Sequence, residues 1–80
     1  MSILDIKVEP FAVEVSFTAD DLVVGLADGR RVSVPLAWFP RLLRATDQQR
    51  ANWRLIGRGI GIHWPELDED VSVESLLTAA

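Results

Sequence analysis

The stretch FAVEVSFTADDLVVGLADGRRVSVP, residues 11–35, decides the fold. Apolar and polar side chains alternate along it, which is the pattern of half-buried strands. The residues expected on one side of each strand are Phe11, Val13, Val15 and Phe17, then Leu22, Val24 and Leu26. Asp20-Asp21 marks the first turn, and Asp28-Gly29 is a favoured pair for a tight hairpin. Arg31 to Val34 returns as a third strand that ends at Pro35, so the stretch predicts a three-stranded antiparallel meander.

The pattern changes to a helical period after Pro35. Phe39, Leu42 and Leu43 have the spacing of one helix face, so we expect a short helix within Leu36–Ala45. Pro40 is tolerated only in its first turn. Thr46, followed three residues later by Gln49, fits a capping box and predicts a second short helix or turn over Asp47–Asn52.

The remainder predicts a hairpin and a last helix. Arg54–Ile56 and Ile60–Trp64 flank Gly57-Arg58-Gly59, with Ile60, Ile62 and Trp64 expected on one face and Pro65 ending the second strand. Ser72 is placed to cap a helix that carries Val73, Leu76 and Leu77 at helical spacing. The fold class is therefore α+β: a small antiparallel sheet, formed by the meander and the later hairpin, with two or three short helices on one face. Residues 1–80 form one domain.

Composition limits the class of protein. The 80 residues carry a net charge of −4 and include no cysteine, which excludes disulfides and thiolate metal sites. No apolar run approaches the roughly 18 residues that span a bilayer. Met1–Pro10 mixes charged and apolar residues, so we expect no signal peptide. The expected product is a soluble domain of the cytoplasm with no membrane contact.

The residues that could carry catalysis are few. Gly57, Gly59 and Gly61 lack the context of a nucleotide loop, and we interpret them as turn glycines plus one needed for close strand approach. His63 is the only histidine, and a metal site could be drawn from His63, Asp68 and Asp70. Pro65 interrupts that spacing, and we favour a strand histidine beside an acidic loop. We therefore expect no enzyme, no cofactor and no metal.

The charge is segregated along the chain. Seven of the eight basic residues lie between Arg30 and Arg58, and both ends of the chain are acidic. The acidic ends could fold back onto the arginines, which we favour, or the arginines could form an anion-binding face. We favour a core position for Trp38, with the alternative that Trp38, Arg41 and Arg44 form an exposed patch typical of binding hot spots. The candidate partner-binding residues are Trp38, Arg41, Arg44 and Arg50, with Glu66, Asp68 and Asp70 as a second surface.

Nucleic-acid binding by this domain alone is not expected. A second helix of barely two turns is too short for a recognition helix, and an acidic chain lacks the surface that neutralises phosphates. A homodimer through an open sheet edge is a further possibility.

Three segments together carry a resemblance: the Asp-Gly-Arg hairpin at Asp28, VPLAWFPRL at residues 34–42, and WRLIGRGIGIHWPELDEDVSVESLL at residues 53–77. With them the chain resembles bacterial domain-of-unknown-function family 2442 over nearly its whole length. The resemblance implies a small α+β domain and no catalytic residue. It also implies members that stand alone or carry a C-terminal helix-turn-helix, often beside a second small gene in a toxin–antitoxin-like arrangement. Because Ala80 follows closely on the motif, we expect no such DNA-binding segment here.

The leading hypothesis is a non-enzymatic protein-interaction domain, with the antitoxin-like member of a two-gene pair as its finer form. The alternatives are an accessory domain of a transcription regulator and a small metal-dependent hydrolase built around His63.

Overall fold

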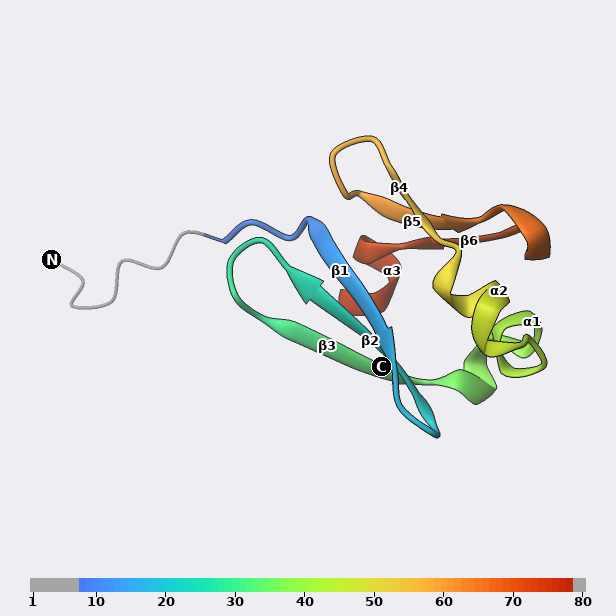
Figure 1. Ribbon diagram of the computed structural model, residues 1–80. Coiled ribbons are helices and arrows are strands. Elements are labelled where there is room, and N and C mark those ends of the chain that lie inside the picture. Colours follow the sequence, from blue (N-terminus) through green and yellow to red (C-terminus); the bar gives the residue numbers. More distant parts are fainter. Residues whose placement is uncertain (1–7, 79–80) are drawn as a thin grey trace, which may run out of the picture.

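The structure, a computed structural model, describes residues 8–78. Met1–Lys7, on which the expectation of no signal peptide partly rests, lie outside the described residues. Two three-stranded antiparallel sheets face one another (Figure 1). The first contains β1 (Ala12–Phe17), β2 (Asp21–Leu26) and β3 (Arg31–Pro35), and the second contains β4 (Arg54–Ile56), β5 (Gly61–Trp64) and β6 (Glu69–Ser72). The α+β class expected from the sequence is confirmed.

The first sheet is the predicted meander, with the strands in the order β1-β2-β3. Leu22, Val24 and Leu26 are all buried, as their alternation predicts. Gly29 adopts a φ of 93°, which glycine reaches without steric cost and which the tight turn after Asp28 requires. The turn chemistry and the hydrophobic alternation agree here, so this part of the fold follows directly from the sequence.

The first strand differs from the prediction in its inward face. The pairing register of β1 shifts between Ala12 and Glu14, so Val13 forms a β-bulge. A bulge inserts one unpaired residue and reverses which side chains point inward on either side of it. Ala12 is therefore buried, whereas Val13 is 56% exposed and Phe11 also faces solvent. The prediction that Phe11 and Val13 share the buried face with Val15 was wrong.

The second sheet contains a strand that the sequence interpretation did not include. Glu69–Ser72, expected as part of an acidic loop, pairs with β5 as β6, with His63 opposite Asp70. Acidic residues are rare in strands, and only Val71 of this strand is buried, so the local signal is weak. Ile60 lies in the turn before β5 and is exposed, so it does not share the buried face of Ile62 and Trp64.

The helices are short and lie at two places. A 3-10 turn η1 (Leu36–Trp38), α1 (Pro40–Leu43) and α2 (Asp47–Ala51) connect the sheets at one end, and η2 (Pro65–Leu67) joins β5 to β6. The predicted capping box of Thr46 and Gln49 is present at α2. Leu42 is fully buried, but α1 is too short to bury Leu43 as well, contrary to the prediction. The last helix, α3 (Val73–Thr78), is capped by Ser72 as expected.

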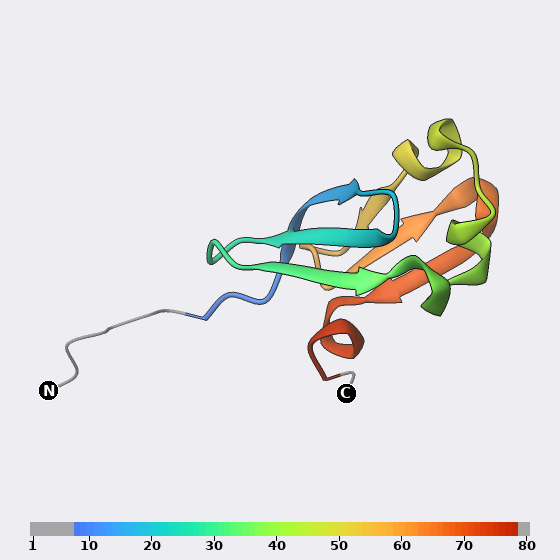
Figure 2. The same cartoon turned by 90° about the horizontal axis from the view of Figure 1, so that it is seen from below.

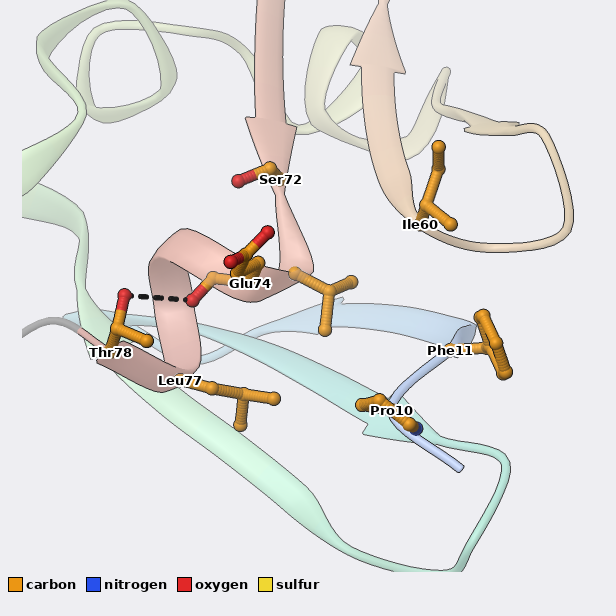
Figure 3. Close-up of a pocket in the computed structure, with 8 residues that line it drawn as sticks. Pro10, Phe11, Ile60, Ser72, Glu74, Leu77 and Thr78 are labelled. Carbon is orange, nitrogen blue, oxygen red and sulfur yellow. Dashed lines mark hydrogen bonds between the residues drawn. The ribbon is translucent and has the colours of Figure 1, made fainter. Parts of the chain in front are cut away.

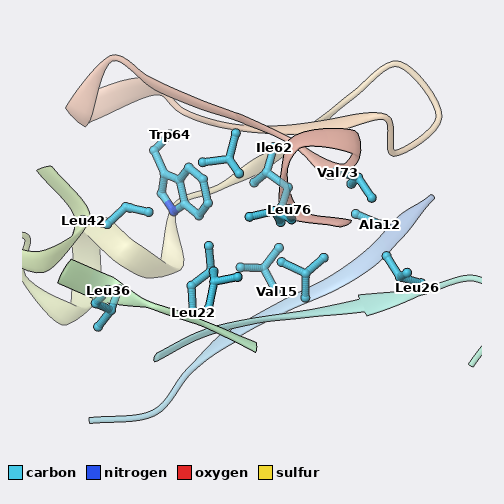
Figure 4. Packing of buried hydrophobic residues seen from close by; sticks show 13 residues of the cluster. Ala12, Val15, Leu22, Leu26, Leu36, Leu42, Ile62, Trp64, Val73 and Leu76 are labelled. Atoms are coloured by element: carbon cyan, nitrogen blue, oxygen red, sulfur yellow. The ribbon is translucent and has the colours of Figure 1, made fainter. Parts of the chain in front are cut away.

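The core lies between the two sheets (Figure 4). Trp64 and Ile62 project from the second sheet toward Leu22 and Val15 of the first. The fully buried Trp64 ring meets Phe17 edge-on, with the ring centroids 6.3 Å apart. The complete buried set is Ala12, Val15, Leu22, Val24, Leu26, Val34, Leu36, Leu42, Ile62, Trp64, Val71, Val73 and Leu76.

The two lateral sides of this sandwich are unlike one another. Helix α3 packs beside β3 and β6 and closes that side, whereas β1 and β4 lie on the opposite side (Figures 1 and 2). At one end of the β1–β4 side the sheets are joined by a backbone hydrogen bond, from the amide of Ala12 to the carbonyl oxygen of Gly59, at 2.7 Å.

No helix among the described residues has the length and apolar character needed to cross a membrane.

Candidate functional site

The end of the molecule formed by η1 and α1 exposes large side chains. Trp38 is 50% exposed and Leu43 is 48% exposed. Arg44, the C-cap of α1, is exposed beside them in the chain. The core position favoured for Trp38 was therefore wrong, and the structure shows the exposed alternative. Trp64 is in the core. Trp53 is partly buried and packs against the core.

Arg41 connects this end to the acidic turn after β5. One guanidinium nitrogen of Arg41, Nη1, donates to the carbonyl oxygen of Asp68 at 2.6 Å and lies 3.4 Å from that of Leu67. Asp68 occupies the left-handed region with a φ of 50°, so its carbonyl is turned toward the helices. Arg41 thus links the helical end to the turn that carries Glu66 and Asp68. We call the two together the helical-end surface, and its residues are Trp38, Arg41, Leu43, Arg44, Glu66 and Asp68.

Arg50, by contrast, is held inside the fold. Its side chain is only 16% exposed, and its Nε and Nη2 donate to the carbonyl oxygens of Leu42 and Leu43, each at 2.9 Å. The guanidinium carbon also lies 5.5 Å from the centre of the Phe17 ring, a cation–π distance. These carbonyls end α1, where helices leave acceptors without partners. Arg50 therefore fixes the position of α1 rather than presenting its charge outward.

Among residues 8–78, pairing of the arginine-rich middle with the acidic ends is limited to one pair of near neighbours, Arg30 with Asp28. Within residues 8–78, the two arginine–carboxylate pairs are Arg30 with Asp28 and Arg50 with Asp47, both between near neighbours in sequence. Arg41 and Arg50 donate chiefly to backbone carbonyls instead. The preference of guanidinium for several acceptors at once, which helix ends supply, explains the difference.

Asp28 shows the strongest electrostatic effect. Its side chain is 3% exposed, receives two hydrogen bonds from the Nε of Arg30, and accepts from the backbone amides of Glu9 and Arg30. The hydrogen bond from the Arg30 side chain, aided by those amides, lowers the pKa of Asp28 to about 2 although burial opposes the shift. This carboxylate holds the β2–β3 turn.

His63 and Asp70 form a contact on the second sheet. The Nδ1 of His63 bonds Oδ1 of Asp70 directly across β5 and β6, and Arg54 occupies the opposite register position on β4. Asp70 thus contacts His63, whereas the backbone of Asp68 contacts Arg41. Among residues 8–78, no three His, Cys, Asp or Glu side chains come close enough to hold a metal ion, so Asp68 does not join His63.

Two hollows on the surface of the described residues bear on function. One, of about 440 Å³, lies where α3 meets the start of β1 and has walls mainly from Phe11, Ile60, Val73 and Leu77 (Figure 3). Its one ionisable lining residue is Glu74, so it suits an apolar group rather than catalysis. The other, of about 420 Å³, runs between β1 and α2 and is lined by Val15, Ser16, Phe17, Asp47, Arg50, Ala51 and Trp53.

The glycine-rich segment is structural, as the sequence analysis concluded. Gly57 and Gly59 have positive φ angles in the β4–β5 turn. A Cβ on Gly61 would lie 3.1 Å from the carbonyl oxygen of Val71, so Gly61 permits close strand approach. The amides of Gly59 and Ile60 both donate to the carbonyl oxygen of Ile56, so these donors are not available to cradle a phosphate.

A comparison with protein families identifies the family of this chain. A family model described as "Protein of unknown function (DUF2442)" matches residues 12–80. The chain belongs to this family. The family confirms the resemblance carried by the Asp28 hairpin and by residues 34–42 and 53–77, and it carries no assigned activity.

Solved structures of other proteins share the fold of this chain. A crystal structure of a protein of unknown function from Rhodospirillum rubrum matches with a TM-score of 0.71 and 28% identity, covering 84% of this chain and 83% of the other. A solution NMR structure of an uncharacterized protein from Chromobacterium violaceum matches with a TM-score of 0.71 and 25% identity, covering 84% of this chain and 63% of the other. No curated protein matches the chain.

Membership of DUF2442 therefore leaves the function uncharacterised, and the surface has to be interpreted from its own chemistry. Sequence reasoning missed Leu43 as an exposed residue and the His63–Asp70 contact. The first follows from the length of α1. The His63–Asp70 contact depends on strand β6. The one signal for β6 in the sequence was the alternation of Glu69 and Val71 with their polar neighbours.

Proposed function

We propose that this DUF2442 chain is a non-enzymatic domain of the cytoplasm that binds a partner protein through the helical-end surface. The observation that carries the proposal is the exposure of Trp38 and Leu43 on one short connecting segment. Exposed tryptophan and arginine side chains are enriched among the residues that dominate binding energies. Exposure of the apolar side chains of Trp38 and Leu43 to water is unfavourable, and a partner that covers them gains the corresponding free energy of burial.

The charges on the helical-end surface suggest the character of the partner. Arg44 is exposed with no ion pair among the described residues, while Glu66 and Asp68 stand on the adjoining turn. Such mixed charge around an apolar centre resembles the polar rim of a protein interface more than a uniformly basic nucleic-acid surface. In its finer form, the proposal is that the chain is the antitoxin-like member of a two-gene pair and that the partner is the neighbouring product.

The experiment is a quantitative pull-down of the tagged full chain from its own host at native expression level. Trp38→Ala and Arg44→Glu should each remove one stoichiometric protein from the wild-type complex. Arg31→Glu, a charge reversal at an exposed residue of β3, is the matched control and should retain it. A partner that is retained by both helical-end variants, or the absence of any stoichiometric protein, would overturn the proposal.

The same purified proteins distinguish the leading proposal from the alternative of an accessory domain in a transcription regulator. A gel shift on the chain's own promoter, with and without the captured partner, should show no shift under the leading proposal. A shift that requires both proteins would favour the regulator.

The hydrolase alternative rests on the His63–Asp70 contact, since an aspartate that holds one ring nitrogen orients the other toward solvent. Metal analysis of the purified protein is the check on it. One bound ion per chain, lost in His63→Ala, would revive this alternative.

A further inference from the structure

The hollow between α3 and the start of β1 leaves apolar side chains in contact with solvent. Phe11, Ile60 and Leu77 line it and are 38%, 57% and 38% exposed. Figure 3 shows Leu77 pointing from α3 toward Pro10, with Phe11 beyond it. At about 440 Å³, the hollow falls within the size range of sites that take up apolar groups. An apolar surface that is both concave and exposed indicates a place where another segment binds.

One unpaired charge lies in the lining of this hollow. Glu74 is the single ionisable residue there, and it is exposed with no ion pair among residues 8–78. The two hydroxyl groups of the lining are already engaged: Ser72 Oγ accepts from the amide of Ser75, and Thr78 Oγ1 donates to the carbonyl oxygen of Glu74 (Figure 3). The hollow therefore suits apolar side chains that are accompanied by a positive charge.

The stretch of sequence that leads into the hollow has this composition. In LDIKVEP, residues 4–10, apolar residues alternate with charged ones, which is the pattern of a segment that buries one face. Pro10 belongs to the apolar series and lines the hollow, whereas Val8, of the same series, is 62% exposed. Leu4 and Ile6 continue the apolar series, and Lys7 between them and Val8 is the only lysine of the chain.

A short tether distinguishes this segment from other occupants. An extended chain spans at most about 3.6 Å per residue, so Leu4 stays within roughly 20 Å of Pro10. Such a tether holds the segment at an effective concentration on the order of millimolar, which exceeds that of most free partners. A second copy that docked hollow to hollow would bring two Glu74 carboxylates together with no cation in the lining to offset them.

We propose that residues 1–7 bind in the hollow of their own chain as a strap. Leu4 and Ile6 then contact Leu77 and Ile60, and Lys7 lies at the rim beside Glu74. The strap covers apolar side chains that are otherwise left to solvent, and access to the hollow for any other group requires its release. This contact is separate from the helical-end surface, so it goes beyond the proposed function.

Nuclear Overhauser contacts between methyl groups of the full chain test the strap directly. We expect contacts of Leu4 and Ile6 with Leu77 and Ile60. In a sample that mixes isotope-labelled and unlabelled chains, we expect no such contact between two molecules. The absence of contacts between the segment and the hollow would overturn the inference. Contacts between molecules would overturn it as well, because the occupant would then be a second copy.

Substitutions on the two faces of the segment provide a matched comparison. Leu4→Ser combined with Ile6→Ser should shift the amide signals of Ile60 and Leu77, because the apolar face no longer favours the hollow. Asp5→Ser changes only the charged face and should leave both signals at their wild-type positions. No shift in the double variant, or equal shifts in the double variant and in Asp5→Ser, would contradict the strap.

The pairing of Lys7 with Glu74 is tested by exchanging the two charges. Lys7→Glu should weaken the contacts between Ile6 and Leu77, because two carboxylates then meet at the rim. Adding Glu74→Lys to Lys7→Glu should restore these contacts. Contacts that Lys7→Glu leaves unchanged, or that the exchange does not restore, would overturn the placement of Lys7 at the rim. None of these results alters the Trp38→Ala pull-down, so the strap and the proposed function are tested separately.

Discussion

Gly59 lies so close to Ala12 that a Cβ on Gly59 would overlap the carbonyl oxygen of Ala12 and stand 2.9 Å from its amide nitrogen. The same two residues form the backbone hydrogen bond that joins the first sheet to the β4–β5 turn. Gly59 also has a φ of 103°, where side chains are rarely tolerated.

The first prediction is that Gly59→Ala lowers the free energy of unfolding by about 3 kcal/mol or more, since it adds backbone strain to a clash that only movement of the sheets relieves. Urea denaturation measures the change. Gly29→Ala is the control, because Gly29 has a similar φ of 93° but open space around it. We expect it to cost only about 1 kcal/mol. Equal losses in the two variants would contradict the role of the junction.

The second prediction concerns two tryptophans in opposite environments. The indole Nε1 of Trp64 donates to the carbonyl oxygen of Arg50 at 3.0 Å, and the ring is fully buried. Trp64→Phe should therefore cost about 2–4 kcal/mol, from a cavity and an unsatisfied carbonyl. Trp38→Phe should change the free energy of unfolding by less than about 0.5 kcal/mol. Denaturation curves followed by circular dichroism test both, and a large loss in Trp38→Phe would show that this ring supports the fold.

The third prediction separates Arg50 from Arg44. Arg50→Gln removes the bonds to Leu42 and Leu43 and the contact with Phe17, so we expect a loss of about 2 kcal/mol. Arg44→Gln should leave stability within about 0.5 kcal/mol of wild type while weakening partner binding. If Arg50→Gln unfolds at the wild-type denaturant concentration, the arginine is not holding α1.

The fourth prediction follows from the lowered pKa of Asp28. The carboxyl has a pKa of about 2 in the folded chain against 3.8 for the free group. The unfolded chain therefore binds more protons between these values, and stability rises with pH there. The contribution of Asp28 is complete above about pH 4 and is lost as the pH falls toward 2.

Urea midpoints measured from pH 2 to 5 provide the check. The wild-type midpoint should fall more steeply toward acid than that of Asp28→Asn, which has no proton to bind. Parallel curves for the two proteins would show that the Arg30 contact does not persist in solution.

Elements were predicted correctly from the sequence where the signals for them are local and strong. The β1–β2–β3 meander, the capping box at Thr46 and the cap at Ser72 were all predicted, because each depends on residues within a few positions of one another. The bulge at Val13 left no local trace, since it arises where the chain must meet the Gly59 turn. Strand β6 was missed for a similar reason: its pairing with β5 outweighs the low strand propensity of Glu69 and Asp70.

The positions of the candidate site residues followed from the sequence only in part. Trp38, Arg41 and Arg44 are exposed on the segment where their pattern placed a binding patch. That Arg41 reaches Asp68, and that Arg50 is enclosed, depend on how the helical connection packs on the η2 turn. Charge counting along the chain does not distinguish an arginine that meets a carbonyl from one that meets solvent.

The two sheets are each built from strands that are consecutive in sequence, and this bears on the order in which the chain folds. Most pairings form between near neighbours, so each meander can assemble at a low cost in loop entropy. The amide of Ala12 and the carbonyl of Gly59, by contrast, bring distant parts of the chain together. We expect this junction, rather than either meander, to form last and to commit both halves to a single cooperative unit.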